Sequence, residues 1–350
     1  PIDGDGDGTA RYDMGCYERE TPGAAFVCSF AGTPLMGTNS MTVVFTASVA
    51  GPGTNSVTYW WDWTNDGVID FGGSTRKIVT NNYAQPGNYS VRLVCTNAVA
   101  VSATQTKTQY IKIWPSVTYA SPTGGNISPY NTWAKAATSL ANAFNEVGAG
   151  GTVWVSNGTY SITAAISIEK AVTIRSLTGA NTTILASTGP QIFLINHPSV
   201  LIDGFRLKGC TMGYYYYGVI QMNSGGTVRN CIIYNNNIGS CGGISPRNAL
   251  ALVEDCIITN NSANHQNTGY GGGVQITAGL VRNCYIAKNS ANDGGGGVYI
   301  ATTGGVISNC TIFRNSRAGG NGSRFGGGIW QDGGTVLRCT LESNTVTGAT

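Results

Sequence analysis

The stretches that decide the fold repeat one pattern: VRNCIIYNNN (228–237), VEDCIITNNS (253–262), VRNCYIAKNS (281–290) and ISNCTIFRNS (307–316). Weaker copies precede and follow them, VLIDGFRLKG (200–209) and VLRCTLESNT (336–345). Equivalent positions recur at intervals of 26, 25, 28, 26 and 29 residues. Between the copies lies a second block, CGGI or GGG followed by Val or Ile. Each repeat therefore carries two short β signals separated by Gly-rich or Asn-rich corners.

The length of this repeat selects the architecture. A period near 26 that is rich in β-branched residues and lacks helical spacing predicts one strand-built coil per repeat. Leucine-rich repeats have a similar period, but the Leu-x-x-Leu-x-Leu frame does not occur in the repeats. We therefore predict an all-β protein whose residues 116–350 form a right-handed parallel β-helix. Equivalent residues would stack about 4.8 Å apart along its axis.

One cysteine in each repeat shares its side of the strand with the Ile or Leu two residues later. We predict an interior stack of free thiols that act as small core residues. Disulfides are not expected in this stack, because in-register Cβ atoms point in parallel and do not converge. A metal site is not expected either, because no histidine accompanies the thiols. The members are Cys231, Cys256, Cys284, Cys310 and Cys339.

Five residues after each of these cysteines lies an asparagine. Stacked Asn side chains can hydrogen-bond along the axis, and Asn tolerates the left-handed backbone conformation of a corner. We predict a structural Asn ladder at a turn, with ligand binding as the alternative. Its members are Asn236, Asn261, Asn289, Asn315 and Asn344.

The segment TWAKAATSLANAFNEV (132–147) carries the clearest helix signal of the chain. Thr132 or Asn131 can cap it, and Leu140 and Phe144 belong to an apolar face. We predict a capping helix over about 132–147 that covers the first coil, because an uncovered sheet edge invites aggregation.

Residues 25–115 alternate short strands with turn residues, which is typical of a β-sandwich. The stretches YWWDWTNDGVIDFGG (59–73) and YAQPGNYSVRLVCTN (83–97) resemble the polycystic-kidney-disease (PKD) module, which implies an immunoglobulin-like fold. Such modules resemble spacers and adhesion units of large extracellular proteins. Trp60, Trp61 and Trp63 suggest either a sugar platform or core packing, and strand alternation favours the core.

The N-terminal tail, residues 1–24, opens with PIDGDGDGTARYDMGCYE (1–18). This stretch resembles the closing segment of secreted bacterial right-handed β-helix repeat proteins, whose fold is that of the pectate lyases. Cys16 stands where Ala is commoner in such segments. Together with a start at Pro1 and an end inside a repeat, the resemblance suggests an excerpt of a longer precursor in which β-helix and PKD modules alternate.

Calcium is the one cofactor that the sequence suggests. Alternate carboxylates at Asp3, Asp5 and Asp7, with Asp13 further on, resemble a Ca²⁺ loop, and the alternative is a solvated acidic turn. A weaker candidate is formed by Asp62, Asp66 and Asp70, where Asp66-Gly67 is equally typical of a hairpin turn.

Two disulfide pairs are suggested by position alone, since a sequence does not fix connectivity. Cys28 and Cys95 lie in predicted strands of one sandwich, although Cys16 competes for Cys28. Cys210 and Cys241 lie near corners of neighbouring coils.

Composition limits the function. Charged residues make up 11% of the chain and the net charge is +3, which argues against a nucleic-acid surface. The sequence has no apolar run long enough for a membrane span. The acids of the repeats are spread over several coils, no nucleophile or phosphate-loop motif occurs, and His197 and His265 have no acidic neighbour in sequence. We therefore expect no enzyme activity.

The expected function is that of a secreted structural protein at the cell surface. Its units would assemble head to tail into an array or filament, with residues 1–18 completing the open end of a neighbouring β-helix. The alternatives are an adhesin or glycan-binding module that contacts extracellular polysaccharide, and a polysaccharide lyase or glycoside hydrolase.

Overall fold

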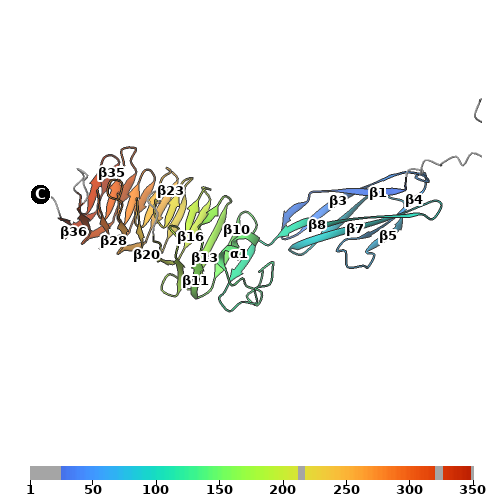
Figure 1. Cartoon of the computed structure of the whole chain (residues 1–350), viewed down its shortest axis with the longest axis horizontal. Helices are drawn as coiled ribbons and strands as arrows, with labels where there is room; N and C mark the ends of the chain where they lie inside the picture. Colours follow the sequence, from blue (N-terminus) through green and yellow to red (C-terminus); the bar gives the residue numbers. More distant parts are fainter. Residues whose placement is uncertain (1–24, 212–216, 320–325, 348–350) are drawn as a thin grey trace, which may run out of the picture. The chain divides into compact units, whose positions relative to one another are not determined.

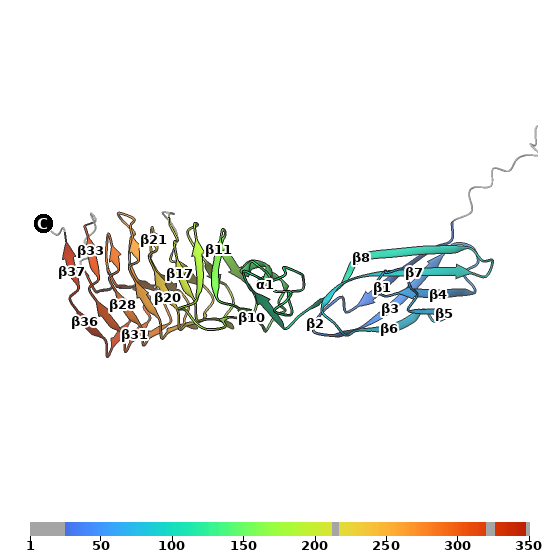
Figure 2. The same ribbon diagram turned by 90° about the horizontal axis from the view of Figure 1, so that it is seen from below.

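The computed structural model describes residues 25–211, 217–319 and 326–347. The chain divides into two compact units after Ile113. Both units consist almost entirely of β-strands, as Figures 1 and 2 show. The predicted all-β class, with an immunoglobulin-like sandwich before a β-helix, is confirmed.

The first unit is a sandwich of two sheets. One sheet has the order β1 (Val27–Thr33), β3 (Met41–Ala50), β6 (Ile78–Tyr83). The other has the order β2 (Met36–Thr38), β8 (Ser102–Trp114), β7 (Gly87–Asn97), β4 (Val57–Asp62), β5 (Phe71–Ser74). Alternate residues of the long strands are buried, as in β3, and they form a single apolar core between the sheets.

The second unit is a coil of parallel strands in which each turn of the chain adds one strand to each of several sheets. The nine-stranded sheet contains β9 (Val117–Ala120), β10 (Gly151–Val155), β13 (Val172–Ser176), β16 (Val200–Asp203), β19 (Gly226–Arg229), β23 (Ala251–Glu254), β27 (Leu280–Arg282), β31 (Val306–Ser308) and β35 (Thr335–Leu337). The eight-stranded sheet contains β11 (Gly158–Ile162), β14 (Thr183–Ser187), β17 (Arg206–Lys208), β20 (Ile232–Tyr234), β24 (Ile257–Thr259), β28 (Tyr285–Ala287), β32 (Thr311–Phe313) and β36 (Thr340–Glu342).

Two further sheets complete the coil. The seven-stranded sheet contains β12 (Ile166–Ile168), β15 (Phe193–Ile195), β18 (Ile220–Met222), β22 (Ile244–Pro246), β26 (Val274–Ile276), β30 (Val298–Ile300) and β34 (Ile329–Gln331). The β21–β37 sheet contains β21 (Asn237–Ile238), β25 (Ser262–Ala263), β29 (Ser290–Ala291), β33 (Ser316–Ala318) and β37 (Thr345–Thr347). Neighbouring strands in all four sheets are one coil apart in sequence and parallel, which makes the unit a β-helix.

The core of the β-helix is built from columns of like residues. In the nine-stranded sheet, Val228 pairs with Val253, which pairs with Val281, and all three are fully buried. In the eight-stranded sheet, Ile258 and Ile286 form a second such column. Because in-register stacking places each apolar side chain on another of the same kind, the repeat builds a continuous core along the axis.

The capping helix is shorter than the sequence predicts. α1 spans Leu140–Glu146, with Ser139 as its N-cap residue, in place of the expected 132–147. Ala137 donates its backbone N–H to Tyr119 O and accepts a hydrogen bond from Ser121 N at its own carbonyl. These bonds extend the edge of the nine-stranded sheet, so the same backbone groups cannot take part in a helix. α1 contacts β9 and β10, and Leu140, Ala143 and Phe144 are its buried residues.

Candidate functional site

The Asn ladder is a continuous chain of buried amides. The side-chain N–H of Asn236 donates to Oδ1 of Asn261 at 2.8 Å, and Asn261 donates to Asn289 at 3.0 Å. The same Oδ1 atoms accept a second hydrogen bond from the backbone N–H of the preceding ladder residue. The ladder continues through Asn315 to Asn344, again at 3.0 Å per step.

Each ladder amide is also tied to the core. Its second N–H donates to a carbonyl oxygen of the eight-stranded sheet, as Asn289 does to Ile258 O at 2.9 Å. Asn236, Asn261, Asn289 and Asn315 are at most 1% exposed. With both amide hydrogens and the oxygen occupied, these four asparagines have no group left for a ligand. Its geometry is that of a structural spine.

The left-handed corner lies one residue earlier than expected. The positive φ angles belong to Asn235, Asn260, Lys288, Arg314 and Ser343, with values of 51° to 56°. The expectation that the ladder asparagines themselves adopt this conformation is therefore wrong. The preceding residue makes the turn, and this aims the following Asn inward, where its amide can reach the next coil.

The thiol column runs parallel to the ladder. Each sulfur contacts the carbonyl oxygen two residues earlier, for example Cys256 with Glu254 O at 3.2 Å and Cys284 with Arg282 O at 3.1 Å. Cys231, Cys256, Cys284 and Cys310 are at most 3% exposed, and Cys339 is half-buried. The repeated contact shows that the thiols share one orientation.

The pKa values of neighbouring thiols in the column are shifted in opposite directions. Hydrogen bonds to Cys231 and Cys284 raise the pKa of Cys256, since a donating thiol resists losing its proton. Hydrogen bonds from Cys256 and Cys310 lower the pKa of Cys284.

The suggested disulfide pairs are free thiols in the structure. Cys28 and Cys95 nevertheless face the same core between the two sheets of the sandwich, and the Cys28 sulfur lies 4.0 Å from Leu93 O. Cys210 and Cys241 occupy different positions around the coil, because Thr211 lies beside Asn237 whereas Cys241 lies beside Tyr217. Burial raises the pKa of both Cys210 and Cys241 to about 12. Cys16 lies outside the described residues.

Of the two calcium candidates, one lies outside the described residues and the other lies within them. Asp3, Asp5, Asp7 and Asp13 lie outside the described residues. The carboxylate of Asp62 accepts backbone hydrogen bonds from Asp66 and Gly67 at 3.2 and 3.0 Å, and Asp70 accepts one from Trp63 at 2.6 Å. These three acids therefore shape the β4–β5 loop. Within the described ranges, no three Asp, Glu, His or Cys side chains gather closely enough to hold a metal ion.

The tryptophans follow the strand alternation. Trp61 is fully buried and stacks on Trp63 with ring centroids 4.8 Å apart, and both rings contact Phe45. Trp60 lies on the opposite side of β4 and is half-buried. Two of the three rings are thus part of the sandwich core, so the three do not form a sugar platform.

A ladder of charges crosses the outer face of the nine-stranded sheet. In register along it lie Arg175, Asp203, Arg229, Glu254 and Arg282. Asp203 Oδ2 lies 2.9 Å from Arg175 and 3.0 Å from Arg229, and Glu254 lies 2.6 Å from Arg282. The side chains of Asp203 and Glu254 are largely buried. Alternating charges on adjacent strands explain this, because each acid is covered by its arginine partners.

Sequence reasoning missed one group of residues, on the outer face of the seven-stranded sheet. Tyr299 packs against Tyr270 with ring centroids 4.9 Å apart and a tilt of 37° between the rings, and its hydroxyl donates to Asp332 at 2.9 Å. The indole of Trp330 donates to the other oxygen of Asp332 at 2.7 Å. Tyr299 and Trp330 occupy neighbouring strands in register. The only sign of this pair in the sequence is that the two aromatic residues lie one coil apart. Aromatic residues are common in strands, so this spacing alone does not identify a site.

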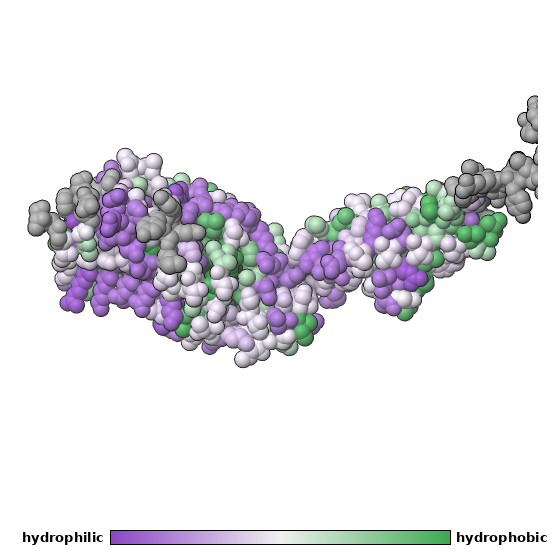
Figure 3. Space-filling view, viewed as in Figure 1, coloured by the Kyte–Doolittle hydropathy of each residue, from purple (hydrophilic) through white to green (hydrophobic). Residues whose placement is uncertain are grey.

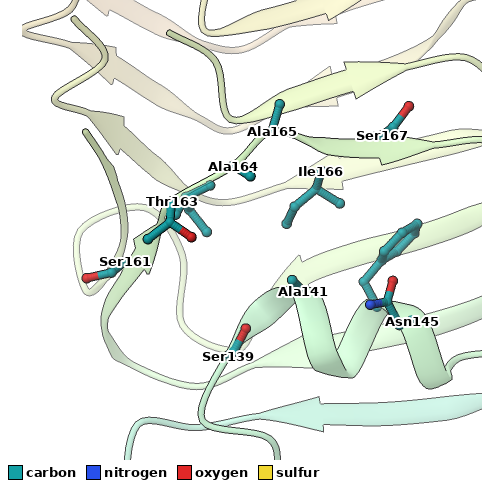
Figure 4. Close-up of a pocket in the computed structure, with 11 residues that line it drawn as sticks. Ser139, Ala141, Asn145, Ser161, Thr163, Ala164, Ala165, Ile166 and Ser167 are labelled. Carbon is teal, nitrogen blue, oxygen red and sulfur yellow. The ribbon is translucent and has the colours of Figure 1, made fainter. Parts of the chain in front are cut away.

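A pocket of about 240 Å³ lies beside α1, as Figure 4 shows. Ser139, Ala141 and Asn145 line it from α1 and its N-cap, and the segment 161–167 lines it from β11 and β12. Both strands are the outermost members of their sheets. The lining consists of uncharged side chains, both apolar and polar, so the pocket contains hydroxyl and amide groups but no acid or base.

Within the described ranges, the two histidines do not belong to a cluster of metal-binding or reactive side chains. His197 and His265 accept hydrogen bonds from nearby backbone N–H groups and shape turns. Figure 3 shows that hydrophilic residues cover much of the visible face of the β-helix. In the part of the chain that the structure describes, no helix has the length and hydropathy of a membrane span.

Comparison with known families agrees with this architecture. The model of the right-handed β-helix region matches residues 164–346, slightly more than half of the chain, and the model of the PKD domain matches residues 28–110. No curated protein matches the chain.

Proposed function

We propose that this chain, which belongs to the right-handed β-helix family and carries a PKD domain, is an extracellular structural protein that assembles head to tail. PKD and β-helix domains are typical of extracellular proteins and fit a structural or adhesin-like role. The observation that carries the proposal is the Asn ladder, in which the four buried side chains use all their polar groups within the coil. A repeat built in this way gains stability by adding neighbours along one axis.

The assembly part of the proposal rests on the edge of the last described coil. β35, β36 and β37 are the outermost strands of their sheets. Leu341 stands in the column of Ile286 and Ile312, which are fully buried, yet it is 51% exposed. Among the described strands none pairs with the outer edge of β36, and an apolar side chain at a sheet edge favours pairing with a further strand.

The partner that we propose for this edge is residues 1–18 of another copy, which resemble the closing segment of a β-helix. Such a contact joins two different surfaces of the same chain. It therefore produces open chains of molecules unless the rotation between copies closes a ring.

Replacing residues 1–18 with a Gly-Ser segment of equal length tests the assembly. The full chain should form end-to-end oligomers in electron micrographs, and the replaced chain should be monomeric with an unchanged β-sheet circular dichroism spectrum. Identical oligomers from both proteins would refute the role of the tail.

Glycan binding is the second candidate function, and the Tyr270, Tyr299 and Trp330 rings favour it. Aromatic rings beside a carboxylate such as Asp332 are suited to the apolar faces and hydroxyl groups of sugars. If this candidate holds, the full chain binds neutral or acidic polysaccharides on a glycan array, and Trp330→Ala weakens binding at least tenfold. Binding that is unaffected by Trp330→Ala would reject this face as the site.

Two further expectations belong to the same proposal. We propose that the chain has no polysaccharide-cleaving activity, which incubation with pectic and other acidic polysaccharides checks through the release of unsaturated or reducing sugars. We also propose that Asp3, Asp5, Asp7 and Asp13 bind calcium. Titration calorimetry with calcium chloride tests this site, and Asp5→Asn should abolish the binding.

A further inference from the structure

The two cysteines of the sandwich lie on opposite sheets and point into the core between them, unlike the thiols of the β-helix column. Cys28 lies on β1 in the three-stranded sheet, and Cys95 lies on β7 in the opposite sheet. Cys28 is 8% exposed and Cys95 is fully buried. The Cys28 sulfur lies 4.0 Å from Leu93 O, on β7 two residues before Cys95, and both cysteines belong to the core between the two sheets. The two thiols therefore converge across the core.

The thiols of the β-helix column have the opposite geometry. They come from successive parallel strands, and each makes the same contact with the carbonyl two residues before it. A disulfide needs Cβ atoms that point toward each other at about 3.8 Å, whereas stacked strands hold theirs in parallel about 4.8 Å apart. Among the described cysteines, geometry therefore favours bond formation between Cys28 and Cys95 alone.

We propose that Cys28 and Cys95 are a site of oxidative modification, at which a disulfide joins the two sheets and fixes the length of the PKD domain under tension. The oxidant is a small disulfide. A thiolate of the pair attacks it, releases one small thiol and forms a mixed disulfide. The second cysteine then attacks the protein sulfur of that mixed disulfide and releases the other small thiol. Two protein thiols are oxidised to one disulfide, and one small disulfide is reduced to two thiols.

The environment of the pair suits this reaction. The hydrogen bond from Cys95 lowers the pKa of the Cys28 thiol, which increases the share of the reactive thiolate. The hydrogen bond to Cys28, together with burial, raises the pKa of Cys95. Cys28 is also the more exposed of the two and lies on a strand at the edge of its sheet. It is therefore the sulfur that meets the oxidant first.

The mechanical consequence follows from strand order. β1 is the first strand of the sandwich and pairs only with β3, so a pull from the N-terminal side loads it directly. A pull from the other side enters through β8, which ends at Trp114 beside the boundary of the unit. A bond between Cys28 and Cys95 removes the chain between them from this path. When the oxidised domain unfolds under load, the chain between the two cysteines therefore does not extend.

The experiment uses the full chain, oxidised with glutathione disulfide or reduced with a phosphine, and stretched between its ends by single-molecule force spectroscopy. Oxidation should lower the mass by about 2 Da, and peptide mapping without reductant should yield a Cys28–Cys95 peptide. The unfolding event of the sandwich should lengthen the chain by about 230 Å less in the oxidised protein, since each residue spans about 3.5 Å when extended.

Cys28→Ala and Cys95→Ala should each abolish the difference between the oxidised and reduced traces, and Cys256→Ala in the column should leave it intact. If one of the two sandwich variants fails to fold, the other and the peptide map still decide the outcome. A Cys16–Cys28 peptide, an unchanged mass after oxidation, or equal extensions in both states would overturn the proposal. Because the stretched molecule is a single monomer, the outcome is independent of head-to-tail assembly.

Discussion

The side chain of Asn289 donates a hydrogen bond to Oδ1 of Asn315 at 3.0 Å, and both side chains are fully buried. The oxygen of Asn289 in turn accepts two hydrogen bonds from Asn261. Asn289→Ala should therefore lower the free energy of unfolding by about 3 kcal/mol, because it leaves several buried donors and acceptors without partners. Urea denaturation measures the loss. Asn267→Ala, on an exposed loop, is the matched control and should change stability by less than about 0.5 kcal/mol.

The glycines of the GGG blocks are explained by the same ladder. A Cβ added at Gly273 would lie 2.8 Å from Gly297 O and 2.9 Å from the side-chain nitrogen of Asn289. Gly273→Ala should destabilise the fold by about 1–3 kcal/mol, since neither neighbour can move freely. At Gly189 the added atom meets nothing closer than 3.6 Å, so Gly189→Ala should be tolerated. Equal melting temperatures for the two variants would contradict this packing.

The contribution of Asp203 to the stability of the fold depends on pH. Burial opposes ionisation of this carboxylate, but hydrogen bonds from Asn230, Arg229 and Arg175 outweigh it, so its pKa in the folded protein is lowered. A lowered pKa means that Asp203 stabilises the fold above its ordinary pKa near 4, and that this contribution disappears as the pH falls through the folded value.

The corresponding variant is Asp203→Asn. Its free energy of unfolding at pH 7 should be about 1–2 kcal/mol lower than that of the unaltered protein, a loss between those typical of exposed and of buried ion pairs. This difference should shrink below about pH 4. Thermal melts of both proteins between pH 2 and pH 8 check this. A deficit that is constant over that range would show that the charge of Asp203 is not involved.

The thiol column should react slowly while the protein is folded. Cys256 and Cys284 are at most 3% exposed, and half-buried Cys339 should be the first of the column to be modified. Alkylation followed by peptide mapping measures each rate, and guanidinium should make all rates fast and similar. Rapid modification of Cys256 in native protein would place its side chain outside the coil.

The coil itself could be predicted from the sequence because each interior position has its own repeating residue. Cys231, Cys256 and Cys284 recur with the period of the chain's turns, and a slip of one residue would expose every one of them. The PKD domain was recognisable for a different reason, since its turn and strand motifs lie close together in the sequence. Both predictions are confirmed by the fold and by the family matches.

The parts that could not be predicted depend on contacts between coils or between elements. The helical pattern of 132–147 is real, but Ala137 forms sheet hydrogen bonds with Tyr119 and Ser121, and tertiary pairing overrides local propensity. The burial of Asp203 depends on arginines one coil before and one coil after it. The contact between Tyr270 and Tyr299 depends on a loop whose path the repeat does not determine.

Sedimentation velocity of the full chain over a range of concentrations tests the central claim, that the molecule is a structural unit which assembles through the edge of its last described coil. Leu341→Lys places a charge in the exposed column position of that edge, and Leu250→Lys places one on a more exposed turn as the control. The account predicts concentration-dependent oligomers for the unaltered chain and for Leu250→Lys, and a monomer for Leu341→Lys. Oligomers that persist in Leu341→Lys, or an unaltered chain that stays monomeric at high concentration, would contradict it.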